Sequence, residues 1–283
     1  MTKVAIITRT KDRPVFLDRA IQSVVHQTYT DYVHVIVNDG GDISVLEAQI
    51  NSLPANIKEK IRTFHRPVAS GAPDTIFNES IDRVQSEYVA VHDSDDSWHP
   101  DFLKLTVERL DKGADGVVVR TDKIIEQVKG NHIQTIKTVQ YMPNMSVVSL
   151  YKQCIDNQLT PISFIYRRAV YEQIGKYDAA LPVVGDWEFG IRFLAATDVE
   201  YLDPGFALAR YHHRKHKGDN SFAKHNHRKY VTMVANKYLR EDIKKGVLGL
   251  GYIISDLKYR QDVRHGIIKA ALPKAVTELF KRP

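Results

Sequence analysis

The chain has 283 residues, an apolar fraction of 43% and a formal net charge of +6. This length suits one large α/β domain with an appendage, and the composition excludes a disordered or fibrous protein. The sequence shows no apolar run of membrane-spanning length and no signal-peptide pattern, and its single cysteine, Cys154, excludes an intrachain disulfide. Together these features predict a cytoplasmic protein.

The first part of the chain alternates strand patterns with helical patterns. Short β-branched runs predict buried strands, and apolar residues at helical spacing predict amphipathic helices between them. The expected strands are 4–8, 32–37, 61–65 and 88–92, and the expected helices are 14–27, 45–53 and 75–84. This alternation predicts a mainly parallel sheet with helices on both faces. Ligands of such a sheet bind beyond the carboxyl ends of its strands, where residues 8–13, 38–41 and 93–96 would lie.

The second part is less regular. We expect strands at 116–120, 161–166, 200–202 and 206–211, a hairpin over 124–139, and helices at 168–175 and 186–196. Residues 212–220 are polar and basic, which predicts a mobile loop, and the pattern from 223 onward is mostly helical.

The positive charge is concentrated at the C-terminal end. Residues 224–283 carry 14 basic and five acidic side chains, whereas the rest carries 26 basic and 29 acidic ones. Such a segment fits a peripheral contact with an anionic membrane, packing on the body of the protein, or a homo-oligomer contact. The sequence leaves these alternatives open, and we do not expect a nucleic acid as partner.

Three acids follow the fourth expected strand: Asp93, Asp95 and Asp96. Carboxylates this close raise one another's pKa, and a divalent cation relieves their repulsion. Oxygen ligands suit Mg²⁺ or Mn²⁺, which can also bridge phosphate oxygens and stabilise a leaving diphosphate. The pattern therefore predicts a metal site, with an acidic helix-capping turn as the structural alternative.

An ordered set of motifs resembles glycosyltransferase family 2, which has the GT-A fold. The motifs are Thr8-Arg-Thr-Lys-Asp-Arg-Pro14, Leu17-Asp-Arg-Ala-Ile-Gln-Ser-Val-Val-His-Gln-Thr-Tyr29, Val37-Asn-Asp-Gly-Gly41 and Asp93-Ser-Asp-Asp-Ser-Trp-His-Pro-Asp101. The resemblance implies a metal-dependent, inverting glycosyltransferase. Such an enzyme moves a sugar from a nucleotide diphosphate donor, with UDP favoured, to a hydroxyl of a glycan or lipid-linked glycan in cell-surface polysaccharide synthesis.

The resemblance also implies residue roles. It assigns nucleotide-sugar binding to Thr8, Arg9, Thr10, Arg13, Asn38, Asp39, Asp93 and Ser94. It assigns the metal to Asp93 and Asp95, completed by His212 or His216, the histidine candidates in the expected loop. It places Asp96, Trp187, Glu188 and Arg214 on the acceptor or diphosphate side.

The segment Leu181-Pro-Val-Val-Gly-Asp-Trp-Glu-Phe189 resembles the part of the family that carries the general base of inverting members. The resemblance thus implies Asp186 as the base, and a carboxylate aimed into a cleft can take the proton of an attacking hydroxyl. An acidic helix cap is the structural alternative. The family has an acid where this chain has Gly185, a departure that affects how the base is oriented.

These inferences give an expected organisation and its rivals. Residues 1–120 would form the nucleotide-sugar half of the GT-A domain, 121–222 the acceptor half, and 223–283 a basic helical extension. The main alternative is a non-catalytic protein that binds carbohydrate or a polyanion on the same fold. A dinucleotide-binding oxidoreductase would need Gly-x-Gly-x-x-Gly after the first strand, and residues 8–13 contain no glycine.

Overall fold

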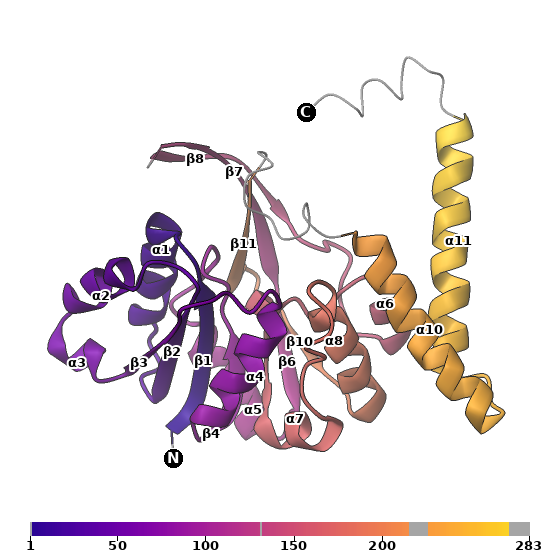
Figure 1. The fold of residues 1–283 in the computed structure, drawn as a ribbon, viewed down its shortest axis with the longest axis horizontal. Helices are drawn as coiled ribbons and strands as arrows, with labels where there is room; N and C mark the ends of the chain where they lie inside the picture. The colour runs from indigo at the N-terminus through magenta and orange to yellow at the C-terminus, as the bar shows by residue number, and fades with distance from the viewer. Residues whose placement is uncertain (1, 131, 215–225, 272–283) are drawn as a thin grey trace.

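The computed structural model describes residues 2–130, 132–214 and 226–271 (Figure 1). Its first half alternates strands and helices in the order that the apolar patterns predict. The elements are β1 (Thr2–Thr10), α1 (Pro14–Val25), β2 (Tyr32–Asp39), α2 (Ile43–Asn51), α3 (Ala55–Lys58), β3 (Ile61–Arg66), α4 (Pro73–Arg83), β4 (Ser86–Val91) and α5 (Phe102–Asp111). The expected α/β architecture is confirmed.

A seven-stranded sheet forms the centre of the molecule, in the order β10-β6-β9-β4-β1-β2-β3. Its remaining strands are β6 (Gly116–Val119), β9 (Phe164–Arg167) and β10 (Glu200–Leu202). Strands β4, β1, β2 and β3 run parallel, so their carboxyl ends share one edge, whereas β9 is antiparallel to both β4 and β6. Because β9 and β10 belong to the second half of the chain, the large sheet extends across the boundary that we expected at residue 120.

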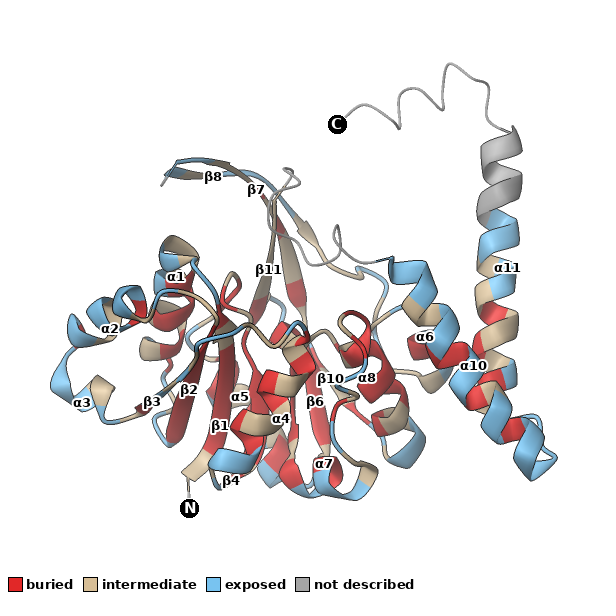
Figure 2. Cartoon of the chain, viewed as in Figure 1, coloured by how far each residue is buried: buried red, intermediate tan, exposed pale blue. Residues whose placement is uncertain are grey.

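Both faces of this sheet are covered by helices, as Figure 2 shows by the buried residues along the strands. Alternate side chains of β1 enter different layers, because successive side chains of a strand point to opposite faces. Ala5 and Ile7 pack in the layer with α4, α7 (Arg168–Ile174) and α8 (Gly185–Ala196). Val4 and Ile6 pack in the layer with α5.

A smaller sheet stands beside the large one, in the order β5-β11-β7-β8. Its strands are β5 (Ser97–Trp98), β7 (Thr121–Lys129), β8 (His132–Gln140) and β11 (Ala209–Arg214). Strands β7 and β8 form the expected hairpin. The loop expected from residue 212 is wrong for its first three residues, because 212–214 pair with 124–126 of β7. Residues 215–220 of that loop lie outside the described residues.

The last described residues form a helical hairpin, as the pattern from residue 223 predicts. Helix α10 (His227–Lys245) ends before Gly246, and α11 (Leu250–Ala271) follows after a short turn. Gly246 has a φ of 67°, a left-handed conformation that suits a residue without a Cβ. Val234, Ile254 and Leu257 pack with Trp187 and Ile191 of α8, and α6 (Leu150–Ile155) borders this cluster. The hairpin therefore shares a hydrophobic core with the element that carries Asp186. Among the described helices, none is both long and apolar enough to cross a membrane.

Candidate active site

Arg9 and Asp39 meet at the carboxyl edge of the large sheet. The Arg9 Nε lies 2.7 Å from Oδ2 of Asp39, which is completely buried. The backbone N–H and the hydroxyl of Ser70 also donate to this carboxylate, each at 2.8 Å. Burial opposes its charge, but the hydrogen bonds from Ser70 and Arg9 outweigh burial and lower the pKa of Asp39. Asp39 is therefore charged, and its ion pair holds the Arg9 side chain at the carboxyl edge of the sheet.

Two of the expected nucleotide-binding residues have other partners. The Thr8 hydroxyl is buried inside the sheet and lies 2.9 Å from Nε2 of His34. The Asn38 amide closes a turn: its Nδ2 donates to the Gly41 carbonyl and its Oδ1 accepts from the Gly41 N–H. Thr10 is also buried, and no described residue pairs with its hydroxyl.

The three acids after β4 occupy different environments. Asp95 lies 2.5 Å from Nη2 of Arg214 and 3.5 Å from Nη1 of Arg13. Asp93 and Asp96 have no comparable cation contact among the described residues, and burial followed by the charge of Asp95 raises the pKa of both, that of Asp93 to about 7. The neighbouring Ser94 is buried as well. The charged forms of Asp93 and Asp96 are thus unfavourable in this cluster, and an added positive charge would stabilise them.

The donor set of the cluster fits a divalent cation that keeps open positions. Asp93 and Asp95 supply hard carboxylate oxygens, and Mg²⁺ is typically held by one or two carboxylates plus water and phosphate. No group of three or more acidic, histidine or cysteine ligands surrounds a single point within the described ranges. A cation here would therefore share its coordination with a bound diphosphate, because the described protein ligands do not enclose it.

Both ring nitrogens of His212, one of the predicted metal ligands, have hydrogen-bond partners. Nδ1 lies 2.7 Å from Oε1 of Glu126, and Nε2 lies 2.9 Å from the Ser97 hydroxyl. Glu126 also pairs with Arg19 at 2.6 Å. With both ring nitrogens engaged, His212 joins β11 to β7 and β5 instead of facing the acids. The other candidate, His216, lies outside the described residues.

The backbone N–H of His212 reaches one of those acids, Asp96. It donates to Oδ1 at 2.7 Å, and Asp96 is 1% exposed. Asp96 therefore connects the turn after β4 to β11. Arg214 does lie at the cluster, where it contacts Asp95 and stacks over the ring of Phe16 at 4.3 Å.

Asp186 stands at the start of α8, directly after a strained turn. Val184 has a φ of 64°, a left-handed conformation that is costly for a β-branched residue and is typical of functional sites. The Asn157 amide donates to Oδ2 of Asp186 at 2.7 Å and fixes the carboxylate. Burial raises the pKa of Asp186. A raised pKa makes a carboxylate a better proton acceptor.

Asp186 lines two larger cavities and a small one of about 10 Å³. One, of about 250 Å³, also contains Asp93, Tyr141, Tyr211 and Asp74. This cavity therefore brings Asp93, one of the acids after β4, and the expected base Asp186 to the same space. Asn157 and Val184 border both cavities with Asp186, so these three residues form the wall between them.

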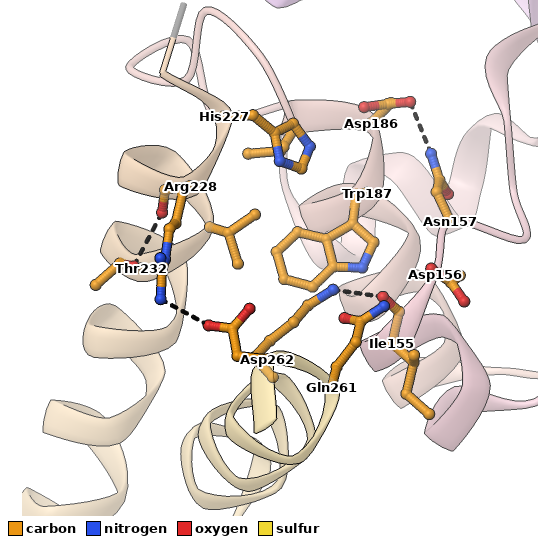
Figure 3. Close-up of a pocket in the computed structure, with 13 residues that line it drawn as sticks. Ile155, Asp156, Asn157, Asp186, Trp187, His227, Arg228, Thr232, Gln261 and Asp262 are labelled. Atoms are coloured by element: carbon orange, nitrogen blue, oxygen red, sulfur yellow. Dashed lines mark hydrogen bonds and ion pairs between the residues drawn. The ribbon is translucent and has the colours of Figure 1, made fainter. Parts of the chain in front are cut away.

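The second cavity, of about 490 Å³, lies between α8 and the C-terminal helices (Figure 3). Its lining comes from α8, from the end of α6 and from α10 and α11. The residues are Ile155, Asp156, Asn157, Val184, Asp186, Trp187, His227, Arg228, Val231, Thr232, Lys258, Gln261 and Asp262. Lys258 donates to the Ile155 carbonyl and its Nζ lies 5.0 Å from the centre of the Trp187 ring. Figure 3 shows this ring between Asp186 and the side chains of α11.

The two residues of α8 that were expected on the acceptor side, Trp187 and Glu188, lie in different environments. Trp187 borders the second cavity, although its ring belongs to the core and its Nε1 donates to the Gln153 carbonyl. Glu188 is completely buried and accepts hydrogen bonds from Arg192 and from the Tyr238 hydroxyl. The helical period turns Glu188 toward α10, away from the second cavity.

Sequence reasoning missed four residues of the smaller cavity and its wall: Asp74, Tyr141, Asn157 and Tyr211. Asp74, Tyr141 and Asn157 lie outside the motifs that carried the resemblance. Asp74 follows Pro73 in the first turn of α4, a position that reads as an ordinary helix start. Tyr211 directly precedes the histidines of the expected loop. This position was the only sequence signal for a role of Tyr211 in the site.

This arrangement defines a class of protein: an α/β transferase domain with a carboxylate cluster on the sheet edge, facing a buried carboxylate across a small cavity. The family model described as "Glycosyl transferase family 2" matches residues 5–175. The chain belongs to that family.

Relatives by sequence include an uncharacterized glycosyltransferase of Rickettsia conorii, 23% identical over 80% of this chain and 36% of the relative. The succinoglycan biosynthesis protein ExoW of Rhizobium meliloti is 34% identical over 35% of this chain and 30% of ExoW. The chain spans about a third of the length of these relatives.

Solved structures of similar fold include residues 1–349 of TarS from S. aureus. Its complex with UDP has a TM-score of 0.65 at 17% identity and covers 98% of this chain and 78% of that one. Its complex with UDP-GlcNAc has a TM-score of 0.64 at 19% identity, over 84% of this chain and 66% of that one. The expected fold and the family resemblance are thus confirmed.

Proposed function

We propose that this chain transfers a sugar from a nucleotide diphosphate donor, with UDP favoured, to a hydroxyl of a glycan or lipid-linked glycan. The observation that carries this proposal is the position of Asp186 in the wall between two cavities, one of which contains Asp93. The UDP and UDP-GlcNAc complexes of TarS support the donor class, and ExoW supports a role in polysaccharide synthesis.

The donor occupies the side of the sheet edge in this proposal. A Mg²⁺ or Mn²⁺ ion held by Asp93 and Asp95 would neutralise the charge that develops on the leaving diphosphate. Arg9, Arg13 and Arg214 already lie on this edge, two of them in contact with Asp95. They would supply further positive charge for the diphosphate.

The acceptor enters from the side of the second cavity. Its hydroxyl attacks the anomeric carbon from the face opposite the diphosphate, while Asp186 takes the hydroxyl proton and the bond to the diphosphate breaks. The Asn157 amide holds the carboxylate of Asp186 during this step. Such a single displacement inverts the anomeric centre. The basic C-terminal segment supports a cytoplasmic enzyme with a peripheral membrane contact.

Asp186→Asn tests the proposal. The variant keeps the hydrogen-bonding shape but not the basicity, so it should bind donor normally and turn over about 10²- to 10⁴-fold more slowly. UDP release from a panel of UDP-sugars measures turnover, and calorimetry with Mn²⁺ measures binding. EDTA should abolish UDP release by the unaltered protein, and Mn²⁺ or Mg²⁺ should restore it.

Asp82→Asn is the matched control, because Asp82 forms an exposed ion pair with Lys176 away from both cavities. Its turnover should equal that of the unaltered chain. Full turnover by Asp186→Asn would remove the base from its role, and UDP release that EDTA leaves unchanged would remove the metal. Failure of every UDP-sugar to bind, with binding of glycans alone, would favour the non-catalytic alternative.

A further inference from the structure

The Asp74 carboxyl occupies the space in which a side chain of residue 185 would lie. A Cβ placed on Gly185 would be 1.5 Å from Oδ2 and 2.6 Å from Cγ of Asp74, far inside any contact distance. Two segments that are distant in sequence, the start of α4 and the start of α8, therefore supply adjoining carboxyl groups. Glycine at 185 is what admits the Asp74 carboxyl next to Asp186.

This carboxyl has no partner that would explain it as a structural group. Asp74 is 4% exposed, and no described residue makes a hydrogen bond with its carboxyl. Leaving a buried polar group unpaired costs free energy of folding, so such a group needs an explanation. Other strongly buried acids of this region each have a hydrogen-bond donor: Asp39 has Ser70, Asp96 has His212, and Glu188 has Arg192.

The Asp74 carboxyl faces a ligand-sized space. It lines the cavity of about 250 Å³ with Asp93 and Asp186, and Phe77, Tyr141 and Tyr211 form much of the apolar wall. Burial, followed by the charges of Asp186 and Glu188, raises the pKa of Asp74 well above its usual range. A protonated carboxyl both donates and accepts a hydrogen bond, which is the capacity that matches a hydroxyl group.

We propose that Asp74 is a specificity-determining residue that binds a hydroxyl of the transferred sugar. The inference rests on the proposed function and assigns a sugar-binding group within the same site. The donor sugar fits better than the acceptor, because Asp74 lines the cavity that contains Asp93 and does not border the second cavity, which the C-terminal helices help to form. The unpaired carboxyl then gains its hydrogen bonds only when the correct sugar is bound.

This geometry permits a test in which the carboxyl group is moved from α4 to α8. Asp74→Ala removes the group, and the double variant Asp74→Ala with Gly185→Asp restores a carboxyl to the same space from α8. The double variant Asp74→Ala with Gly185→Ala is the matched control, since it fills the space without a carboxyl. UDP release is measured for UDP-glucose, UDP-galactose, UDP-GlcNAc and UDP-GalNAc, together with the Kd for UDP and the Tm.

Asp74→Ala should lower kcat/KM for the preferred sugar about 10- to 100-fold and reduce its discrimination against the other sugars. The Kd for UDP should not change, and the Tm should stay equal or rise because an unpaired buried carboxyl is gone. Gly185→Asp in the Asp74→Ala background should recover most of the lost kcat/KM and discrimination, and Gly185→Ala should not.

Unchanged kcat/KM and discrimination in Asp74→Ala would overturn the inference, as would a Tm that falls along with activity. Asp74→Ala alone decides these outcomes if the double variants do not fold. An unaltered protein that releases no UDP from any of the four sugars would instead contradict the proposed function. An active unaltered protein with an equally active Asp74→Ala variant would contradict only the role of Asp74.

Discussion

At the scale of single residues, the sheet edge holds two kinds of buried carboxyl group. Asp39 is surrounded by donors and its pKa is lowered, so it is charged at neutral pH. Asp93, Asp96 and Asp186 lie where burial dominates, and the pKa of each is raised. The first kind anchors the fold around Arg9. The second kind destabilises the protein when charged, and a bound cation or substrate would relieve that cost.

Comparison with Asp93→Asn should show the free-energy cost of charging Asp93 as a pH-dependent difference in stability. The folded pKa of Asp93, about 7, exceeds the unfolded value, so the folded state binds more protons and loses stability as the pH rises toward 7. Asparagine does not titrate. In EDTA, the stability of the variant relative to the unaltered protein should therefore increase by about 2 kcal/mol between pH 5 and pH 8.

Thermal unfolding across this pH range measures the difference. Mn²⁺ should stabilise the unaltered protein at pH 8 more than the variant, because the cation favours the Asp93 carboxylate. A stability difference that is constant with pH would contradict the raised pKa of Asp93.

At the scale of elements, helix α8 connects the site to the C-terminal hairpin. Its first residues present Asp186 to both cavities, and two residues later Glu188 turns inward. Glu188 accepts from Arg192 of the same helix and from Tyr238 of α10. The packing of α10 against α8 thus depends on this buried polar network.

Glu188→Ala should destabilise the fold by about 3 kcal/mol, because Arg192 loses its buried counter-charge and Tyr238 loses its acceptor. Urea unfolding measures the change. Glu172→Ala on α7 is the control, since this acid is exposed and its removal should alter stability by less than about 0.5 kcal/mol. Equal stability of the two variants would contradict the structural role of Glu188.

At the scale of the whole molecule, the C-terminal hairpin completes the larger cavity. Helix α8 and the end of α6 supply one part of its lining, and α10 and α11 supply the opposite wall (Figure 3). Val234, Ile254 and Leu257 fix the hairpin against α8. In our proposal the hairpin therefore shapes the entrance for the acceptor.

Thr232→Trp should fill the larger cavity from α10. We expect it to abolish the stimulation of UDP release by methyl glycosides, while slow UDP release to water continues because the donor side is intact. Met233→Trp is the matched control, because Met233 is 43% exposed and does not line the cavity. Equal stimulation in both tryptophan variants would contradict an acceptor route through this cavity.

Much of the fold was predictable because its signals are local. Buried β-branched runs and helical spacing located β1 to β4, the β7–β8 hairpin and the helices α1, α4 and α8. The extension of β11 through Arg214 was not predictable, because its polar residues resemble a loop. They form a strand only because β7 provides a partner for residues 212–214.

The sequence by itself determined that acids follow β4, that Asp186 begins a helix, and that both belong to a glycosyltransferase pattern. Only the tertiary structure decided the partners: His34 for Thr8, Glu126 for His212, Arg192 and Tyr238 for Glu188, and the space at Gly185 for Asp74. Periodicity and motif spacing describe neighbours along the chain. Hydrogen bonds and ion pairs instead form between groups that packing brings within about 3 Å from distant segments.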